Sequence, residues 1–266
     1  MKNSNLSDER LAFWNSRAYL DLAAGSGDIN LKMLEIRAIS KHIGSKGKVL
    51  DAGCGNSRTL VSLSTKFQGI QFFGFDYSPE MINESKMYIR AQDLHNKISV
   101  CEGSLLDKSS ELGGKLGVKD NPFDCVYTER SIINLDSFDQ QVKSIEMLWS
   151  LVCPGGRLIL CEAFNDGLEE INFYRKSADL HPISPPWHNL YLNIKELSGI
   201  VLNNLEKSEI IEFSGSYYFA SRVLNARMSQ DMGCEPAYDT SINLCSMNLA
   251  SLPVCGQSKL VIFHKL

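Results

Sequence analysis

The stretch VLDAGCGNSRTL, residues 49–60, joins an apolar run to a segment of small polar residues. Asp51 lies near the end of the apolar run, and Gly53 and Gly55 follow it at a spacing of two residues. This pattern predicts a β-strand that turns directly into an α-helix. Backbone N–H groups at such a turn point toward a ligand, and the neighbouring residues decide which ligand fits.

Two kinds of adenosine-containing cofactor use such a turn, a dinucleotide and a methyl-donating sulfonium. In the dinucleotide fingerprint G-x-G-x-x-G a third glycine allows close packing of helix and strand, but Arg58 stands at that position. The Asp51 carboxylate would also repel a pyrophosphate. An amino-acid group fits better, because Asp51 can hold its ammonium while the amides at the helix start take its carboxylate.

Asp76 is a second acid at the end of an apolar run, as Asp51 is at the end of the first. An acid at this place can accept hydrogen bonds from both hydroxyl groups of a ribose. The alternative is that Asp76 caps the next helix, because DYSPEM (76–81) contains capping residues. Asp76 alone does not separate the two cofactors, since both contain adenosine.

Strand-like and helix-like patterns alternate along the chain. The predicted strands are 48–52, 70–76, 98–102, 123–128, 157–163, 208–219 and 259–264. The predicted helices among the first five strands are about 57–67, 79–94 and 137–152. Near-continuous apolar strands separated by helices indicate an α/β protein with a doubly wound parallel sheet, covered on both faces.

Three segments lie outside this alternation: 7–45, which reads as two helices broken at 25–28, the aromatic- and proline-rich 164–193, and the insert 228–257. Ligands of open parallel sheets bind at the carboxyl ends of the strands, so long additions are candidates for a lid over that edge. We expect one domain over 1–266. Its expected parts are an N-terminal helical cap (1–45), a cofactor-binding core (46–165) and acceptor-side cap segments (166–207 and 228–257).

The composition is that of an ordinary globular protein, with 44% hydrophobic and 22% charged residues. A formal charge of −4 and the lack of a dense basic run argue against a nucleic-acid partner. The polar start MKNSNLSDER and the lack of a long apolar stretch predict neither a signal peptide nor a membrane contact. The eight cysteines show no metal-ligand spacing, so we expect reduced cysteines, no metal and a cytoplasmic protein.

Five motifs in this order and spacing resemble those of class I S-adenosylmethionine-dependent methyltransferases. They are VLDAGCG (49–55), FFGFDYSPEMI (72–82), VCEGSLLD (100–107), FDCVYTERSIINL (123–135) and VCPGGRLILCEAF (152–164). The resemblance covers about residues 45–165. It implies a Rossmann-like sheet of seven strands, mostly parallel with an antiparallel last strand, and S-adenosyl-L-methionine as the cofactor.

The same resemblance implies which residues contact the cofactor. They are Asp51, Gly53, Cys54, Gly55 and Ser57 in the first motif, Asp76, Tyr77 and Met81 in the second, and Ser104, Leu105 and Thr128 in the next two. Two positions depart from the family pattern. Ser57 replaces a glycine, and Ser104 replaces the acid that binds the adenine amino group in many members, which predicts weaker cofactor binding.

The acceptor side is expected in the aromatic-rich segment. His188, in PPWHNLY (185–191), is the best candidate for a general base, because prolines stiffen its approach and Trp187 and Tyr191 flank it as candidate substrate contacts. The alternative is that His188 and Trp187 only pack the cap against the sheet.

The loop after the fourth strand supplies further candidates. Glu129 could touch the cofactor or act as a base, or it could form a salt bridge with Arg130. Arg130 could hold an anionic substrate, as could Arg175 and Arg222, although each could instead be a structural ion pair.

Methyl transfer from a sulfonium requires mainly alignment, and a base is needed only where the acceptor carries a proton. We expect a methyltransferase that acts on a small molecule, with O-methylation of a sugar or secondary metabolite favoured because an aromatic cap can enclose a compact ligand. The alternatives are an RNA or protein methyltransferase, or a cofactor-binding protein without transferase activity. A nicotinamide oxidoreductase is disfavoured by Asp51 and Arg58. The sequence leaves the oligomeric state open.

Overall fold

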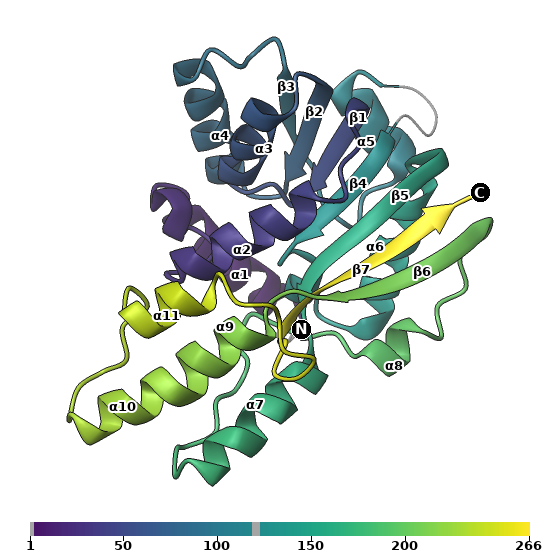
Figure 1. The fold of residues 1–266 in the computed structure, drawn as a ribbon. Coiled ribbons are helices and arrows are strands. Elements are labelled where there is room, and N and C mark those ends of the chain that lie inside the picture. The colour runs from purple at the N-terminus through teal and green to yellow at the C-terminus, as the bar shows by residue number, and fades with distance from the viewer. Residues whose placement is uncertain (1–2, 119–122) are drawn as a thin grey trace.

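A computed structural model describes residues 3–118 and 123–266. Within them, a seven-stranded sheet has the order β3-β2-β1-β4-β5-β7-β6 (Figure 1). Strands β1 to β5 pair in parallel, and β7 is antiparallel to both of its neighbours, β5 and β6. The strands are β1 Lys46–Ala52, β2 Gly69–Asp76, β3 Ile98–Glu102, β4 Phe123–Glu129, β5 Val152–Ala163, β6 Leu205–Glu212 and β7 Ser258–Lys265. The expected Rossmann-like sheet with an antiparallel last strand is confirmed.

The helices connect the strands and extend beyond one end of the sheet. They are α1 Asn3–Arg17, α2 Ile29–Ser40, α3 Arg58–Lys66, α4 Pro79–Ala91, α5 Ser109–Leu116, α6 Phe138–Ser150, α7 Asn165–Ser177, α8 Ile194–Leu197, α9 Gly215–Phe219, α10 Asn225–Asp231 and α11 Ser241–Ser246. A π-helical segment, Ala220–Leu224, joins α9 to α10. Short 3₁₀ turns are η1 Asp21–Ala23 and η2 Ile132–Asn134. None of these helices is long and apolar enough to cross a membrane.

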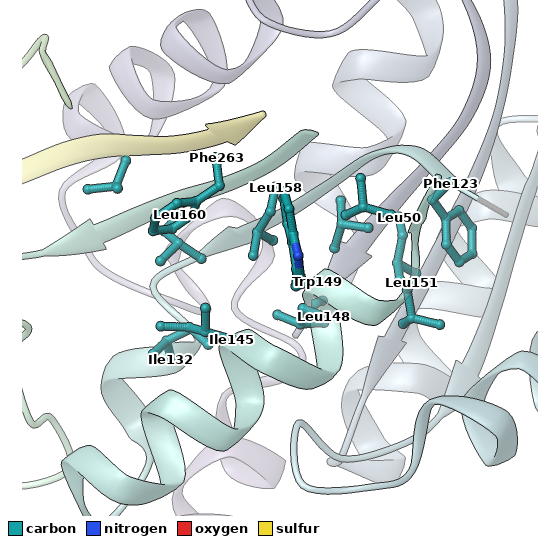
Figure 2. Packing of buried hydrophobic residues seen from close by; sticks show 14 of the residues in the cluster. Leu50, Phe123, Ile132, Ile145, Leu148, Trp149, Leu151, Leu158, Leu160 and Phe263 are labelled. Atoms are coloured by element: carbon teal, nitrogen blue, oxygen red, sulfur yellow. The ribbon is translucent and has the colours of Figure 1, made fainter. Parts of the chain in front are cut away.

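The core lies on both faces of the sheet because successive strand residues point to opposite sides. Leu50 belongs to a cluster with residues of α5 and α6, whereas its neighbour Val49 belongs to a cluster with residues of α2, α3 and α4. Figure 2 shows Ile145 and Leu148 of α6 beside Leu158 of β5. The two-sided packing explains why the strands are near-continuous apolar runs.

The predicted strand 208–219 is wrong over its second half. β6 ends at Glu212, and the chain turns at Ser214, whose hydroxyl donates a hydrogen bond to the backbone of β7. Tyr217 and Tyr218 then lie on α9, where both are buried. Tyrosine is common in strands, so the two tyrosines in this run favour a strand prediction. The tertiary contacts that bury them on a helix are not visible in the sequence.

A layer of helices lies beyond one end of the sheet (Figure 1). It consists of α7, α9, the π-helical segment, α10 and α11, and it packs on α2 through a cluster that includes Leu34, Ile171 and Tyr217. The proposed cap segment 166–207 forms most of α7, all of α8 and the first residues of β6. The segment 228–257 forms the end of α10, α11 and the chain up to β7.

Candidate active site

The turn after β1 is fixed by two backbone hydrogen bonds. The N–H groups of Gly53 and Cys54 both donate to the Phe75 carbonyl oxygen on β2, each at 2.9 Å. Gly53 has a φ of 84°, in the left-handed region that favours glycine. A Cβ at Gly53 would overlap the Cβ of Ser131, just after β4. The glycine therefore lets the β1 turn approach the loop after β4 at the carboxyl edge of the sheet.

A pocket of about 210 Å³ lies at this edge. Its wall contains nine of the eleven residues expected to bind the cofactor: Asp51, Gly53, Cys54, Gly55, Asp76, Tyr77, Met81, Ser104 and Leu105. The other two, Ser57 and Thr128, are fully buried and do not line it. The Ser57 hydroxyl lies 2.5 Å from the Ser85 hydroxyl, so it joins α3 to α4. The glycine turn and the two strand-end acids are thus brought together around one pocket.

Asp51 is buried with one carboxylate oxygen unpartnered. Its Oδ2 accepts a hydrogen bond of 2.8 Å from the Tyr127 hydroxyl, but Oδ1 has no partner among the described residues. Burial, reinforced by the charge of Glu129, raises the pKa of Asp51 to about 8 despite the opposing effects of Tyr127 and Lys32. A cation bound in the pocket would supply the missing partner and favour the ionised form.

Asp76 lines the pocket from the end of β2. Its two carboxylate oxygens accept hydrogen bonds from the backbone N–H groups of Gly55 and Ser78, each at 2.9 Å. The side chain that caps α4 is Ser78, which accepts from the Met81 N–H at 3.1 Å. Burial raises the pKa of Asp76 to about 6, although these backbone bonds oppose the shift. Each oxygen keeps a second lone pair, so Asp76 can still accept from a ligand hydroxyl.

A buried charged pair lies at the β4 side of the pocket. Lys32, on α2, places its ammonium 2.8 Å from Glu129 Oε2, and the Thr59 hydroxyl donates to the same oxygen at 2.6 Å. Burial opposes ionisation of Glu129, but the charges of Lys32 and Arg130 outweigh it and hold the pKa of Glu129 below its ordinary value. Glu129 Oε1 has no hydrogen-bond partner among the described residues.

Arg130 does not pair primarily with its neighbour Glu129, as one alternative had it. Its Nε lies 3.2 Å from Glu35 Oε2, and Glu35 is fully buried on α2. Burial raises the pKa of Glu35 to about 8, against the lowering effect of Arg130. Arg130 has a φ of 54°, which is strained for a non-glycine residue and is typical of functional sites.

Helix α1 and the turn after it cover one side of the pocket, and we call residues 7–25 the lid. Ser7, Arg10 and Trp14 of the lid belong to the pocket wall. Arg10 forms an ion pair of 2.6 Å with Asp136, in the segment between η2 and α6. This ion pair fixes helix α1 of the lid to the β4 side of the pocket.

The other end of the lid is fixed to the glycine turn. The Asn56 side-chain amide donates to the backbone carbonyls of Ala18 and Asp21, at 3.1 and 2.9 Å. Arg58 forms ion pairs with Asp21, at 2.7 Å, and with Glu84, at 3.1 Å. Arg58 stands where a dinucleotide fingerprint has its third glycine, and here it anchors the lid.

The structure does not bring the aromatic-rich segment into the pocket wall. His188 packs on the lid, with its ring 4.5 Å from Phe13 and 5.3 Å from Trp14, and only Trp14 of these lines the pocket. Burial, with Arg10 and Arg17, lowers the pKa of His188 to about 4, so the ring is neutral near pH 7. Trp187 also contacts this aromatic group and is 55% exposed.

Tyr191 packs against the core cluster that contains Leu50, and it also lies outside the pocket wall. This geometry therefore does not favour His188 as a base with Trp187 and Tyr191 as substrate contacts. Arg130 and Glu129, by contrast, do line the pocket. Arg175 and Arg222 lie elsewhere, around a second cavity described below.

Arg10, Trp14 and Lys32 are among the pocket residues that were not expected from the sequence. A signal was present for Lys32, because it lies three residues before Glu35 on a helix whose buried face includes Leu31 and Ile36. Charged residues so close to an apolar helix face indicate a buried pair. The sequence predicted a helical cap over 1–45, but it did not indicate which residues of this cap line the pocket.

The sheet order, the glycine turn and the strand-end acids are those of a Rossmann-like S-adenosylmethionine-dependent methyltransferase. The chain belongs to the methyltransferase-domain family, whose family model matches residues 43–182.

Solved structures agree in fold. A putative methyltransferase from Haloferax volcanii, in complex with the Trm112 methyltransferase activator, is 13% identical with a TM-score of 0.60, over 95% of this chain and 97% of that one. Geranyl diphosphate C-methyltransferase from Streptomyces coelicolor, crystallised with S-adenosyl-L-homocysteine, is 12% identical with a TM-score of 0.57, over 89% and 80%. A putative sarcosine dimethylglycine methyltransferase from Galdieria sulphuraria is 13% identical with a TM-score of 0.50, over 89% and 84%.

The cofactor is S-adenosyl-L-methionine, and the residues of the pocket fit it. Asp51 Oδ1 is an unpartnered buried acceptor for an ammonium, and Asp76 offers lone pairs to the ribose hydroxyls. Met81 and Leu105 provide apolar wall for an adenine ring. A pyrophosphate would meet the carboxyl groups of Asp51 and Asp76 instead of a cation.

Proposed function

We propose that this methyltransferase transfers the methyl group to a small molecule that carries a hydroxyl group. The observation that carries the proposal is the lid over one side of the pocket. The lid covers the same cavity that holds the glycine turn, and Trp14 and Arg10 of the lid stand in its wall. A pocket with aromatic and charged lid residues in its wall suits a compact acceptor beside the cofactor better than a loop of a macromolecule.

Bound S-adenosylmethionine supplies an activated methyl group, so the protein must chiefly position an acceptor oxygen. In our proposal Glu129 does this. Its Oε2 is held by Lys32 and Thr59, which leaves Oε1 to accept a hydrogen bond from the acceptor hydroxyl.

The proton of that hydroxyl would pass to Glu129 Oε1 as the acceptor oxygen takes the methyl group, and the carbon–sulfur bond of the sulfonium would break to leave a neutral thioether. A carboxylate of low pKa suffices for this step, because an oxygen that gains a methyl group becomes strongly acidic before it loses its proton. Asp51 and Asp76 hold the cofactor, and Trp14 helps to exclude water from the reaction.

An RNA or protein acceptor is the competing proposal. The structural neighbour from Haloferax volcanii is a complex with a methyltransferase activator, but that likeness concerns the fold alone. The formal charge of −4 gives no electrostatic support for an RNA acceptor.

The test uses S-adenosylmethionine with a labelled methyl group and three separate acceptor pools: small-molecule extract, total RNA and total protein. We expect label to appear only in the small-molecule pool. We also expect the Asp76→Asn variant, which keeps the shape of the side chain, to lose most of the label in that pool. Label in RNA or protein, also dependent on Asp76, would contradict the proposed acceptor while leaving the enzyme class unchanged.

A further inference from the structure

A second cavity, of about 250 Å³, lies in the helical layer and is separate from the methyl-transfer pocket. Its wall is formed by α7, the π-helical segment, α10 and the chain before α11. The polar side chains in this wall are Arg175, Ser221, Arg222, Asn225 and Tyr238, and the wall contains no carboxyl group. We propose that this cavity is an oxyanion site, which binds a carboxylate or a phosphate group through Arg175 and Arg222.

Arg175 brings a positive charge to the wall of this cavity. Its Nε donates to the His181 carbonyl oxygen at 2.7 Å, and one terminal nitrogen donates to the Arg222 carbonyl oxygen. Among residues 3–118 and 123–266, no carboxylate forms an ion pair with Arg175. Both bonds hold the guanidinium in a fixed orientation without compensating its charge.

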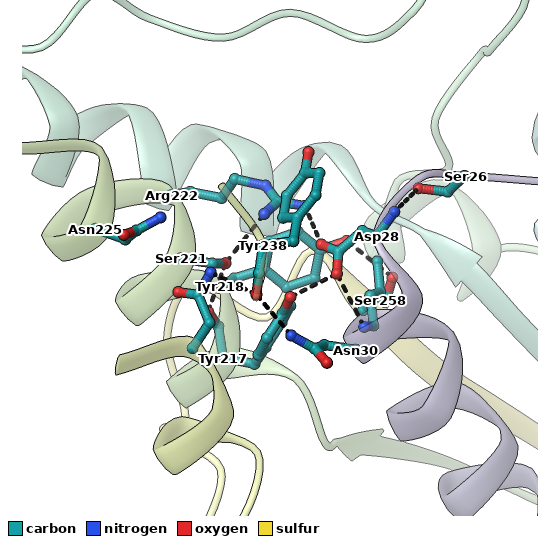
Figure 3. A network of polar contacts seen from close by, with 12 residues as sticks. Ser26, Asp28, Asn30, Tyr217, Tyr218, Ser221, Arg222, Asn225, Tyr238 and Ser258 are labelled. Carbon is teal, nitrogen blue, oxygen red and sulfur yellow. Dashed lines mark hydrogen bonds and ion pairs between the residues drawn. The ribbon is translucent and has the colours of Figure 1, made fainter. Parts of the chain in front are cut away.

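The positive charge of Arg222 is balanced by one carboxylate among the described residues. Its Nη2 forms an ion pair of 2.7 Å with Asp28, which is fully buried at the start of α2 (Figure 3). Asp28 Oδ1 also accepts from the Leu31 N–H and from the Tyr217 hydroxyl, and Asp28 forms no ion pair with Arg175 among the described residues. Two guanidinium groups therefore share one carboxylate beside the cavity, which leaves one positive charge in excess.

The two arginines also repel one another. Burial, together with the charge of Arg222, lowers the pKa of Arg175 from its ordinary value. A bound oxyanion would relieve this repulsion, and the planar guanidinium fork suits carboxylate and phosphate groups.

The surroundings hold the site in shape. Tyr238 lies over the Arg222 guanidinium, with 4.8 Å between the arginine carbon and the ring centroid (Figure 3). The backbone carbonyl of Tyr238 accepts from the Asn30 amide at 2.7 Å, and that of Ala237 accepts from the Asn225 amide at 2.9 Å. Side chains of α2 and α10 thus fix the tyrosine over the arginine.

The π-helical segment carries Ser221 and Arg222 into this wall. Such a segment is less stable than α-helix and is frequent at functional sites, because it shifts side chains out of the regular helical positions. Here it turns the Arg222 side chain toward Asp28 and the cavity.

The oxyanion has two conceivable sources, an anionic end of the methyl acceptor or a separate small anion. The two cavities share α2 as a neighbour, since Asp28 pairs with Arg222 while Lys32, one turn later, lines the methyl-transfer pocket. The residues of the oxyanion site are the same whichever of these molecules carries the anion.

Inorganic phosphate is the probe for binding, measured by calorimetry and by thermal melting against potassium chloride of equal ionic strength. We expect phosphate to bind and to raise the melting temperature where chloride does not. Arg175→Gln should weaken phosphate binding about tenfold or more, because a charge-assisted pair of hydrogen bonds is lost. Arg227→Gln is the matched control, since Arg227 is a neighbouring arginine on α10 that pairs with Asp231 and does not line the cavity.

Arg175→Lys keeps the charge without the fork and should bind phosphate several-fold more weakly than the parent. It serves as the test if Arg175→Gln does not fold. Equal effects of phosphate and chloride on the parent protein would overturn the proposal, as would equal phosphate affinity of the parent and the folded Arg175 variants.

A second measurement distinguishes the sources. If the acceptor supplies the oxyanion, phosphate should raise the KM for the acceptor and leave S-adenosylhomocysteine affinity unchanged. If the anion is a separate ligand, phosphate should bind together with the acceptor without competing. Both results require phosphate binding that depends on Arg175, so either one supports the site.

Discussion

The carboxyl group of Asp51 favours ligand binding at the expense of the stability of the ligand-free protein. The side chain is 1% exposed, and one of its oxygens finds no hydrogen-bond donor in the described residues. Burial raises its pKa to about 8, so the free protein holds it mostly protonated at pH 7. A ligand ammonium favours the ionised form, and the proton must then leave as the ligand binds.

We therefore predict that S-adenosylhomocysteine binding near pH 6.5 releases close to one proton. Calorimetric titrations in two buffers of different ionisation enthalpy measure this number. Asp51→Asn should abolish the release and weaken binding about tenfold or more, because the ammonium loses a charged partner. The same variant should be more stable than the parent at pH 8 without ligand. Unchanged proton release in Asp51→Asn would show that another group titrates.

His188 provides a second prediction at this scale. Because the pKa of His188 is lowered to about 4, its ring should not titrate between pH 6 and pH 8. His188→Ala should leave the shape of the pH–rate profile in this range unchanged and should reduce turnover only as much as Phe13→Ala, which removes another ring from the same aromatic group. A loss of about 10²–10⁴-fold confined to His188→Ala would instead identify His188 as a general base.

The lid is held in place by side-chain contacts with other parts of the fold. Its contacts with Asp136 and Glu80 lie at partly exposed positions, whereas Ser78 and Asn56, which also hold it, are buried. Exposed pairs of this kind contribute about 0.2–1 kcal/mol each, so the lid can open for ligand exchange without unfolding the sheet. Trp14 differs from these contacts, because it forms part of the pocket wall itself.

Trp14→Ala should accelerate the dissociation of S-adenosylhomocysteine about tenfold or more, since a large aromatic wall is lost from the closed state. Competition with excess unlabelled ligand measures the dissociation rate. Trp187→Ala is the control, because Trp187 joins the same aromatic group but is half exposed and lies outside the wall. Equal acceleration in both variants would show that the aromatic group holds the lid as a unit.

At the scale of the whole molecule, several buried carboxyl groups have raised pKa values. Burial raises the pKa of Asp51 and Glu35 to about 8, and that of Glu162 to about 7. A group whose pKa is higher in the folded state stabilises the protein most below its unfolded pKa, and this contribution is lost as pH rises through the folded pKa. Glu129 has a lowered pKa, so its contribution is lost only at acidic pH.

The ligand-free protein should therefore become less stable by about 1–2 kcal/mol between pH 7 and pH 8. Urea unfolding at pH 7, 7.5 and 8 measures the trend. Glu35→Gln or Asp51→Asn should each reduce the slope, while a variant of an exposed acid such as Asp231→Asn should not. A free energy of unfolding that rises over this range would contradict the raised pKa values.

Much of the fold could be predicted from the sequence, because strand periodicity and the glycine turn are local signals. The acids Asp51, Asp76 and Glu129 were predictable for the same reason, since each lies at the end of a strand and the sheet brings these ends together. Trp14 and Arg10 could not be placed, because their position depends on how α1 packs on other elements. The sequence could not show whether His188 faces the pocket for a related reason: its aromatic neighbours indicate a packed group but not which surface that group covers.

β7 has a consequence for synthesis on the ribosome. It follows β6 in the chain but lies between β5 and β6 in the sheet, and it makes hydrogen bonds with both. A nascent chain that ends before β7 has the glycine turn, the strand-end acids and the lid, but β6 has no neighbour to pair with. The far edge of the sheet must therefore wait until β7 emerges from the ribosome and inserts between β5 and β6.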